Sequence, residues 1–242
     1  MNLWGITDRG SVRKENQDAY QAVFLQAGLG LGVVCDGMGG ALAGNVASRL
    51  ALETFVSVVT NQCSNGLPLE PKNVLLQAAE KANETVYQRS REDKACHGMG
   101  TTIVAALSNG VHAWVLNVGD SRCYVADVES IQQVTRDHSV VGDLVARGDI
   151  TPEEARNHPR KNLITRALGV ETVVTPDLYT LECRRDSFLL LCSDGLSNVI
   201  SDQELLYEII HGGTPESCCQ RMLEISLNRG APDNVTAVLF QL

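Results

Sequence analysis

Four aspartates share one local setting, because each lies at the end of an apolar run that is typical of a β-strand. Asp36 and Asp194 follow such runs directly or after one residue, Asp120 follows another after a glycine, and Asp233 precedes the last one. Asp18 lies at a further expected strand margin. If these carboxylates converged, they would repel one another unless cations neutralised them. A set of oxygen ligands without His or Cys favours Mg²⁺ or Mn²⁺.

Each of these aspartates has a simpler explanation, since Asp and Asp-Gly often end strands as turn residues. That explanation fits any one of them better than it fits the set. Asp36-Gly37 is followed by Met38-Gly39-Gly40 and then a helical pattern, so it is not a two-residue hairpin turn. Asp194-Gly195 also leads into a helix. Glycines beside Asp36 would let ligands approach the backbone closely.

Phosphoryl transfer is the chemistry that such a site would support. Two cations a few ångström apart can activate a water and hold a phosphoryl oxygen between them. An arginine would add a bidentate contact to the phosphate. Arg13, five residues before Asp18, is the best candidate, although a surface arginine beside Lys14 is the alternative interpretation.

Composition excludes several other classes. The chain has 242 residues, with 20 Lys and Arg against 29 Asp and Glu, and a net charge of −9. An acidic balance argues against nucleic acid as a partner. No apolar run approaches the roughly 20 residues that span a bilayer, so we expect no membrane insertion. The first 15 residues carry several charges, so there is no signal-peptide apolar region. The eight cysteines form no CxxC pair and are interpreted as reduced thiols of a cytoplasmic protein.

Strand and helix patterns occur in groups along the chain. Apolar spacing predicts strands first, then helices over 45–60 and after Pro71, then strands again with a hairpin at Asn109-Gly110. A polar and mostly helical block follows over 139–169, and then strands over 173–180 and 187–192, two capped helices and a last strand over 235–242. This order favours an α+β fold with two antiparallel sheets packed together and helix pairs on the outer faces. We expect a single domain over 1–242.

Seven short motifs, in order along the chain, carry a resemblance to a known family. They are Arg13-x-x-x-Gln17-Asp18, Asp36-Gly37-Met38-Gly39-Gly40, Gly100-Thr101-Thr102, Asn117-Val118-Gly119-Asp120-Ser121-Arg122, Asp137-His138-Ser139, Cys192-Ser193-Asp194-Gly195-Leu196 and Asp233-Asn234-Val235-Thr236. The series resembles the PPM (type 2C) metal-dependent serine/threonine protein phosphatases, and the match runs from Gly5 to Leu242 in the family's order. It is most similar to the compact bacterial members that oppose Hanks-type kinases.

The resemblance implies a central β-sandwich flanked by helix pairs, with a binuclear Mg²⁺ or Mn²⁺ centre at one edge. The 139–169 block corresponds to the family's flap, which lies beside the site and influences substrate choice. By this resemblance, Asp36 bridges both metals, and Asp194 and Asp233 complete the ligands of the first metal. The Gly37 carbonyl binds the second metal, and Asp18 acts on that metal through water. Asp120 forms a third-metal site with Asp194, and Arg13 binds the substrate phosphate.

The implied reaction is hydrolysis of phosphoserine and phosphothreonine in proteins by a water activated at the two ions, with a third ion as an addition. Arg13, Asp36 and Asp194 would carry the catalysis. The expected partners are phosphorylated proteins and a cognate Ser/Thr kinase, and the expected state is a cytoplasmic monomer. No cysteine is needed as a nucleophile.

One departure from the family pattern bears on catalysis. The family usually places a His at the position of Met38, or just after Gly-Gly at the position of Ala41. That His is thought to protonate the leaving oxygen, and general acid catalysis contributes about 10²–10⁴-fold. Its absence raises the alternative of a weak or inactive module that binds phosphoproteins or a kinase. Retention of the five aspartates and Arg13 disfavours that alternative. His138 is expected to be structural, at the base of the flap.

The missing His predicts a skewed substrate preference. Aryl phosphates, whose leaving groups need little protonation, should be hydrolysed disproportionately well relative to phosphothreonine peptides. Met38→His or Ala41→His should narrow that gap, with Met38→Leu as the matched control. The measurement is the ratio of kcat/KM for the two substrates. An unchanged ratio after both His substitutions would show that the general-acid argument is misplaced.

Overall fold

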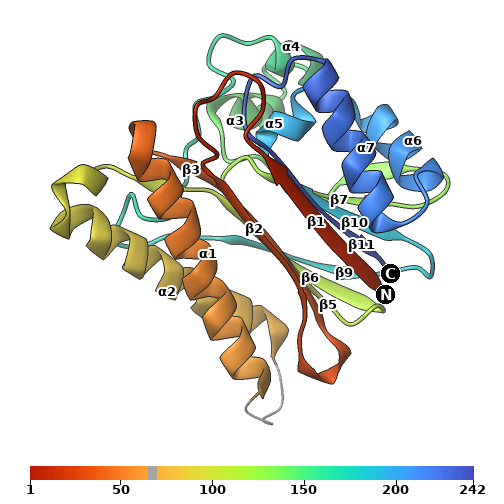
Figure 1. Ribbon diagram of the computed structural model, residues 1–242, viewed down its shortest axis with the longest axis horizontal. Coiled ribbons are helices and arrows are strands. Elements are labelled where there is room, and N and C mark those ends of the chain that lie inside the picture. Colours follow the sequence, from red (N-terminus) through yellow and green to blue (C-terminus); the bar gives the residue numbers. More distant parts are fainter. Residues whose placement is uncertain (65–69) are drawn as a thin grey trace.

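Two antiparallel sheets packed face to face form the centre of the molecule (Figure 1). The computed structural model describes residues 1–64 and 70–242. The first sheet has the order β1 (Asn2–Asp8), β11 (Val235–Gln241), β10 (Phe188–Cys192), β7 (Arg122–Ala126) and β8 (Ile131–Gln133). The second has the order β2 (Asp18–Phe24), β3 (Gly30–Met38), β5 (Ile103–Ser108), β6 (His112–Val118) and β9 (Asp177–Glu182), and β4 (Gly100–Thr101) pairs with the end of β3.

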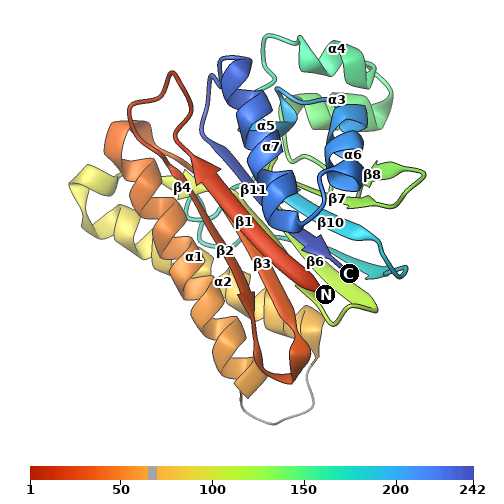
Figure 2. The ribbon, with the colours of Figure 1, turned by 45° about the vertical axis from the view of Figure 1, so that its right-hand side comes forward.

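A helix layer covers the outer face of each sheet (Figure 2). The long helices α1 (Gly40–Ser64) and α2 (Pro71–Glu92) pack on the second sheet. The helices α5 (Asp194–Ser197), α6 (Asp202–His211) and α7 (Pro215–Asn228) pack on the first. This arrangement confirms the expected α+β sandwich with helix pairs on both faces.

Alternating side chains on the central strands supply the three hydrophobic cores. On β3, Leu31 and Val33 face α1 and α2, whereas Val34 faces the other sheet. On β10, Leu189 and Leu191 lie between the sheets. Because side chains of a strand alternate with period two, one apolar run fills two layers at once. This explains why these strands read as continuous apolar runs in the sequence.

Local signals place the helix starts. Ser201 and Glu204 form a capping box at the start of α6, with the Ser201 hydroxyl accepting from the Glu204 backbone N–H. Thr151 and Glu154 form a second one at α4 (Pro152–Arg156). These reciprocal bonds satisfy backbone N–H groups that would otherwise lack partners. The Asn109-Gly110 hairpin is also present, with Gly110 at φ +86° between β5 and β6.

The flap is less helical than the sequence pattern predicted. It contains α3 (Val140–Arg147) and the short α4, and the chain from 157 to 176 has no further helix. Gly148, at φ +77°, ends α3 in a left-handed cap. Pro159 disfavours helical backbone at the residue before it, which prevents α4 from continuing. The strand predicted over 173–180 begins only at Asp177, and the short β8 carried too few residues to be recognised.

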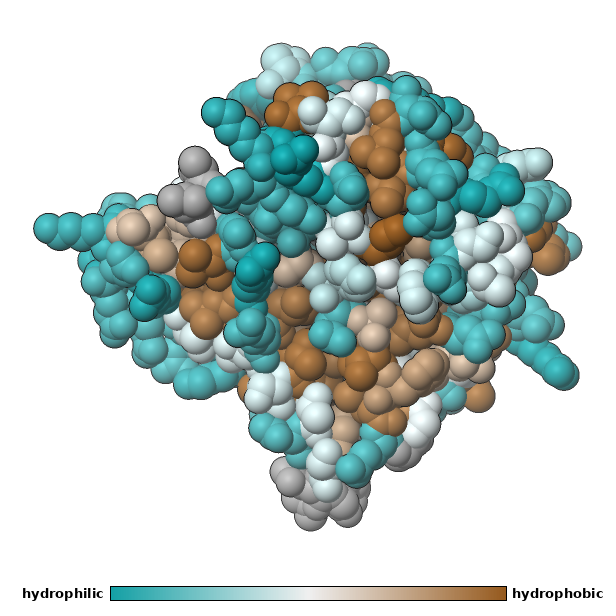
Figure 3. Space-filling model, in the orientation of Figure 1, coloured by the Kyte–Doolittle hydropathy of each residue, from teal (hydrophilic) through white to brown (hydrophobic). Residues whose placement is uncertain are grey.

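Apolar side chains reach the surface along the sandwich edge. Figure 3 shows hydrophobic atoms gathered over β1 and β2, between α1 and α7. Trp4 of β1 and Phe24 of β2 are among the exposed large residues. No helix in the described part of the chain is long and apolar enough to cross a membrane.

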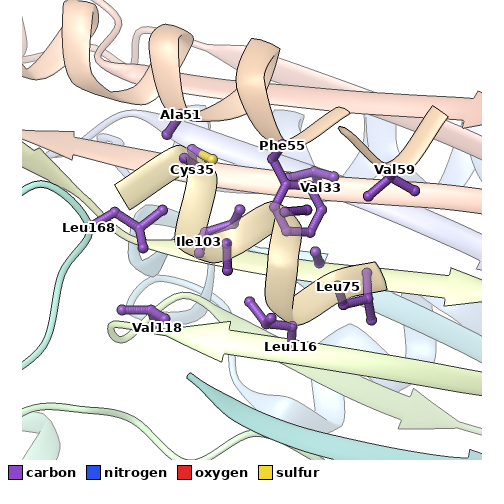
Figure 4. Packing of buried hydrophobic residues seen from close by; sticks show 14 of the residues in the cluster. Val33, Cys35, Ala51, Phe55, Val59, Leu75, Ile103, Leu116, Val118 and Leu168 are labelled. Atoms are coloured by element: carbon purple, nitrogen blue, oxygen red, sulfur yellow. The ribbon is translucent and has the colours of Figure 1, made fainter. Parts of the chain in front are cut away.

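Phe55 tests the packing of α1 on the second sheet. Its ring is fully buried and lies over Val33 in the core beneath α1 and α2 (Figure 4). Phe55→Ala should lower the free energy of unfolding by about 3–5 kcal/mol, because both burial and packing are lost. Phe24→Ala, at a side chain that is 54% exposed, should change it by less than about 1 kcal/mol. Urea unfolding measures both, and equal effects would contradict the packing described here.

Candidate metal centre

The predicted aspartates converge at one end of the sandwich. The loop between β1 and β2, the end of β3, the start of α5 and the residues before β11 meet there, next to α3 (Figure 1). They form a pocket of about 520 Å³. Its wall includes the predicted residues Arg13, Asp36, Gly37, Asp120, Asp194 and Asp233. Residues up to 220 positions apart in the chain therefore share one cavity.

Strand register brings Asp18 beside Asp36. The two residues are direct partners in the antiparallel pair of β2 and β3. Asp18 does not line the pocket but lies behind it, buried, and its Oδ2 accepts a 2.6 Å hydrogen bond from the Thr236 hydroxyl. Its Oδ1 is buried without a hydrogen-bond partner. An unsatisfied buried carboxylate oxygen is costly, so this atom is suited to a positively charged ligand or to a water held by one.

A chain of hydroxyls fixes the backbone around Asp36. Thr102 Oγ1 accepts from the Asp36 N–H at 2.9 Å, and the Thr102 N–H donates to the Asp36 carbonyl at 2.9 Å. The Thr102 and Ser121 hydroxyls are 2.8 Å apart and hydrogen-bonded. Ser121 follows Asp120, so this chain ties together two strand ends that carry carboxylates. Thr102 and Ser121 belong to the sequence motifs, but the sequence pattern predicts no role for either residue.

Close backbone packing brings Asp194 next to Asp233. A Cβ on Gly195 would overlap the carbonyl oxygen of Asn234, so only glycine permits this approach. The Ser193 hydroxyl accepts from the Thr236 N–H at 3.0 Å and joins the same two segments. The pattern Asp-Gly in this motif therefore has a packing reason.

Asn234 holds the loop that carries Arg13. Its Oδ1 accepts from the Gln17 N–H at 2.8 Å. Its Nδ2 donates to the carbonyls of Arg9 and Glu15 at 2.8 and 2.9 Å. Sequence reasoning missed this role as well, because the partners lie more than 215 residues away.

Arg13 points its guanidinium at the carboxylates. One terminal nitrogen lies 2.7 Å from Asp233 Oδ2, while the side chain stays 53% exposed. The hydrogen bond to Asp233 raises the pKa of Arg13, so the group stays charged. An exposed guanidinium at the mouth of the pocket is placed to meet an incoming anion.

Burial and mutual repulsion raise the pKa values of the carboxyl groups. Desolvation is the largest cause in each case, and neighbouring aspartates raise the pKa values further, whereas the hydrogen bonds from Thr236 and Ser193 lower the pKa of Asp18. The pKa is raised to about 6 for Asp194, about 7 for Asp18 and about 8 for Asp120. The pKa of Asp36 is raised well above its usual value, again by burial first and then by its aspartate neighbours. Uncompensated negative charge is therefore disfavoured at this end of the sandwich.

These residues fit a divalent cation. The donors are hard oxygens, as Mg²⁺ and Mn²⁺ prefer. Within residues 1–64 and 70–242, no three acidic, histidine or cysteine side chains stand close enough to enclose an ion by themselves. Repulsion between neighbouring aspartates nevertheless contributes, after burial, to the raised pKa values of Asp36, Asp120 and Asp194. We interpret the spacing as the result of like charges that face one cavity without closing on it.

The flap lies beside this pocket, as expected. A second pocket of about 380 Å³ extends beneath α3 and shares Asp120 and Asp194 with the first. Val141 and Val145 of α3 form part of its apolar side. Met38 lines the first pocket, so a thioether lies where a histidine would otherwise be expected, and the side chain of Ala41 is outside the described part of the structure.

The raised pKa values predict how the protein without cations responds to pH. Asp194, Asp18 and Asp120 bind their protons more tightly when folded than when unfolded, where the pKa is near 3.8. Their stabilising contribution is complete below about pH 4 and is lost as the pH rises through about 6 to 8. In EDTA, the free energy of unfolding should therefore fall across this range. Urea unfolding at several pH values measures it, with Asp120→Asn expected to flatten the fall. A free energy that rises steadily over the range would contradict the clustering.

Comparison with known proteins agrees with this geometry. Residues 9–226 match the family described as protein phosphatase 2C. The chain is 34% identical over 235 residues to the serine/threonine phosphatase stp of Listeria monocytogenes, which covers 97% of this chain and 93% of that protein.

Solved structures give the same result. The crystal structure of the serine/threonine phosphatase Stp1 from Staphylococcus aureus superposes with a TM-score of 0.92 at 37% identity, covering 99% of this chain and 94% of that one. The catalytic domain of the serine/threonine protein phosphatase PstP, in complex with two manganese ions, gives a TM-score of 0.83 at 34% identity, covering 98% and 96%. The ordered motifs, the fold and these matches over nearly the whole length show that the chain belongs to the protein phosphatase 2C family.

Proposed function

We propose that this chain hydrolyses phosphoserine and phosphothreonine in proteins with the help of bound Mn²⁺ or Mg²⁺. The observation that carries this proposal is the convergence of Asp36, Asp194, Asp233 and Arg13 on one pocket. Carboxylates without positive partners would destabilise such a pocket, and an arginine at its mouth suits a phosphate. The proposed domain is the whole span 1–242.

The proposed division of labour follows the positions of the side chains. Asp36 and the Gly37 carbonyl, with Asp194 and Asp233, are the proposed ligands of two cations. Asp18, behind Asp36, acts through water, and Asp120 with Asp194 holds a third ion. Divalent cations in such a site lower the pKa of a bound water and withdraw charge from a phosphoryl oxygen.

The chain's own groups bind and orient the substrate. Arg13 pairs with the phosphate oxygens and stabilises the charge that develops on them. The hydrogen bonds of Thr102, Ser121 and Asn234 hold the backbone segments that carry Asp36, Asp120 and Arg13 around the pocket. Met38 has no proton to donate, so the leaving oxygen takes its proton from solvent or from another group in the pocket.

The proposed partners are phosphorylated proteins and a Ser/Thr kinase that phosphorylates them. The proposed state is a monomer in the cytoplasm, in keeping with the eight free cysteines. The alternative, an inactive module that binds phosphoproteins, is disfavoured because it has no physical need for five gathered aspartates, four of which are buried with raised pKa values.

Substitution of single carboxylates tests the proposal. Asp36→Asn or Asp194→Asn should lower kcat for an aryl phosphate by at least about 10³-fold, since each removes a charged ligand while keeping the shape of the side chain. EDTA should abolish the wild-type activity and Mn²⁺ should restore it. Glu216→Gln, an exposed change on α7, is the matched control. Full activity in EDTA would defeat the cation mechanism. Tight Mn²⁺ binding by calorimetry without hydrolysis of any phosphopeptide would favour the inactive module.

A further inference from the structure

His138 binds the turn that carries Asp120 at two points. The turn residue Gly119 donates its N–H to His138 Nδ1 at 3.1 Å, and its carbonyl accepts from the His138 N–H at 2.9 Å. The imidazole is 4% exposed, and the Gly119 N–H bond is buried. Asp120 is the next residue along the chain. Its backbone is therefore held on one side by His138.

The other side of the same turn is held by the chain of hydroxyls described above. Ser121, directly after Asp120, is hydrogen-bonded to Thr102. Gly119 itself has φ +111°, and a Cβ there would meet the Thr102 side chain at 2.5 Å. The turn therefore packs against Thr102 on one side and is hydrogen-bonded to the His138 ring on the side of the flap. A turn fixed at both ends gives its central carboxylate one direction.

The hydrogen bonds of the ring select one tautomer. Nδ1 accepts a hydrogen bond, so the proton of the neutral ring is on Nε2. Nε2 lies 3.1 Å from Asp177 Oδ2, to which it donates. Asp177 Oδ1 in turn accepts from Arg166 at 2.9 Å. A proton on Nδ1 would face the Gly119 N–H, donor against donor, and would turn the Nε2 lone pair toward Asp177. Arg166 Nη1, 3.2 Å from Nε2, donates to Asp177 Oδ1 when Nε2 carries the proton, and its charge opposes a charged ring. Burial lowers the pKa of His138, in agreement with a neutral ring.

The backbone of His138 also joins both ends of the flap. The His138 carbonyl accepts from the Thr165 N–H at 2.8 Å, and Ser139 forms a β-bridge with Ile164. The ring lines neither of the two pockets described above. His138 therefore does not touch substrate, and a role as general acid has no geometric support.

We propose that His138 is a positioning residue for Asp120: its Nδ1 holds the Gly119 turn so that the Asp120 carboxylate faces the cation pocket, and Asp177 keeps the ring in the tautomer that this requires. This inference rests on the proposed function, because it concerns the cation that Asp120 and Asp194 would share. It goes beyond that function because it gives His138 and Asp177 a role in positioning a cation ligand, in addition to packing at the base of the flap.

Two conservative variants separate the two ends of the ring. His138→Asn keeps an oxygen acceptor near the position of Nδ1, whereas His138→Gln places its polar group near Nε2 and leaves the Gly119 N–H without a partner. Calorimetry measures Mn²⁺ binding to the full chain. In His138→Gln, the affinity for the ion that depends on Asp120 should fall about 10-fold or more, as it typically does when a residue that orients a metal ligand is lost. His138→Asn should remain within about 3-fold of wild type.

A double-mutant cycle distinguishes positioning from a general structural effect. Asp120→Asn identifies the Mn²⁺ ion in question, and in that background His138→Gln should have no further effect on Mn²⁺ affinity. A merely structural role would weaken every bound ion and would persist in the Asp120→Asn background. Either of those results would overturn the proposal.

Asp177 offers an independent pair of variants. Asp177→Ala removes the acceptor that fixes the tautomer and should weaken the same ion, whereas Asp177→Asn retains an acceptor oxygen and should not. Equal Mn²⁺ affinity in all Asp177 and His138 variants would overturn the inference while leaving the proposed function intact. Hydrolysis that does not depend on Mn²⁺, together with Mn²⁺ binding that Asp36→Asn leaves at the wild-type affinity, would instead overturn the proposed function.

Discussion

Negative charge is concentrated at one end of the sandwich, and long-range contacts of the fold hold it there. Asp18 and Asp36 are neighbours across two strands, and Asp194 and Asp233 are brought together by close backbone packing at Gly195. Burial opposes ionisation of Asp18, Asp36 and Asp194, and raises the pKa of each. Holding these carboxylates together lowers the stability of the fold, and a bound divalent cation would offset that loss. The same few side chains therefore bear on both stability and the proposed function.

Long-range hydrogen bonds hold the carboxylate-bearing segments together despite their repulsion. Thr236 donates to Asp18 from a strand 218 residues away, and Asn234 pins the Arg13 loop from a similar distance. The strands themselves are fixed by three cores, so their ends have little freedom. These bonds keep the segments that carry the carboxylates around one pocket, although no three of the described acidic side chains stand close enough to enclose an ion by themselves.

Local sequence patterns predicted much of the fold and of the candidate site. Features that depend on contacts between distant segments could not be predicted from the sequence. Strand-end aspartates, the capping box at Ser201 and the Asn109-Gly110 hairpin each depend on a few adjacent residues. That Asp18 would lie behind the pocket depends instead on the register of β2 with β3. The roles of Thr102 and Asn234 depend on partners distant in the chain. The flap was expected to be mostly helical because its polar composition hides where Gly148 and Pro159 interrupt the helices.

Anomalous diffraction at the manganese edge, from crystals grown with Mn²⁺, tests whether Asp36, Asp194 and Asp233 together hold divalent cations. We expect at least two anomalous peaks, one of them between these three residues and within ligand distance of all three carboxylates. Mn²⁺ peaks elsewhere on the surface, with these three side chains binding only water, would contradict it.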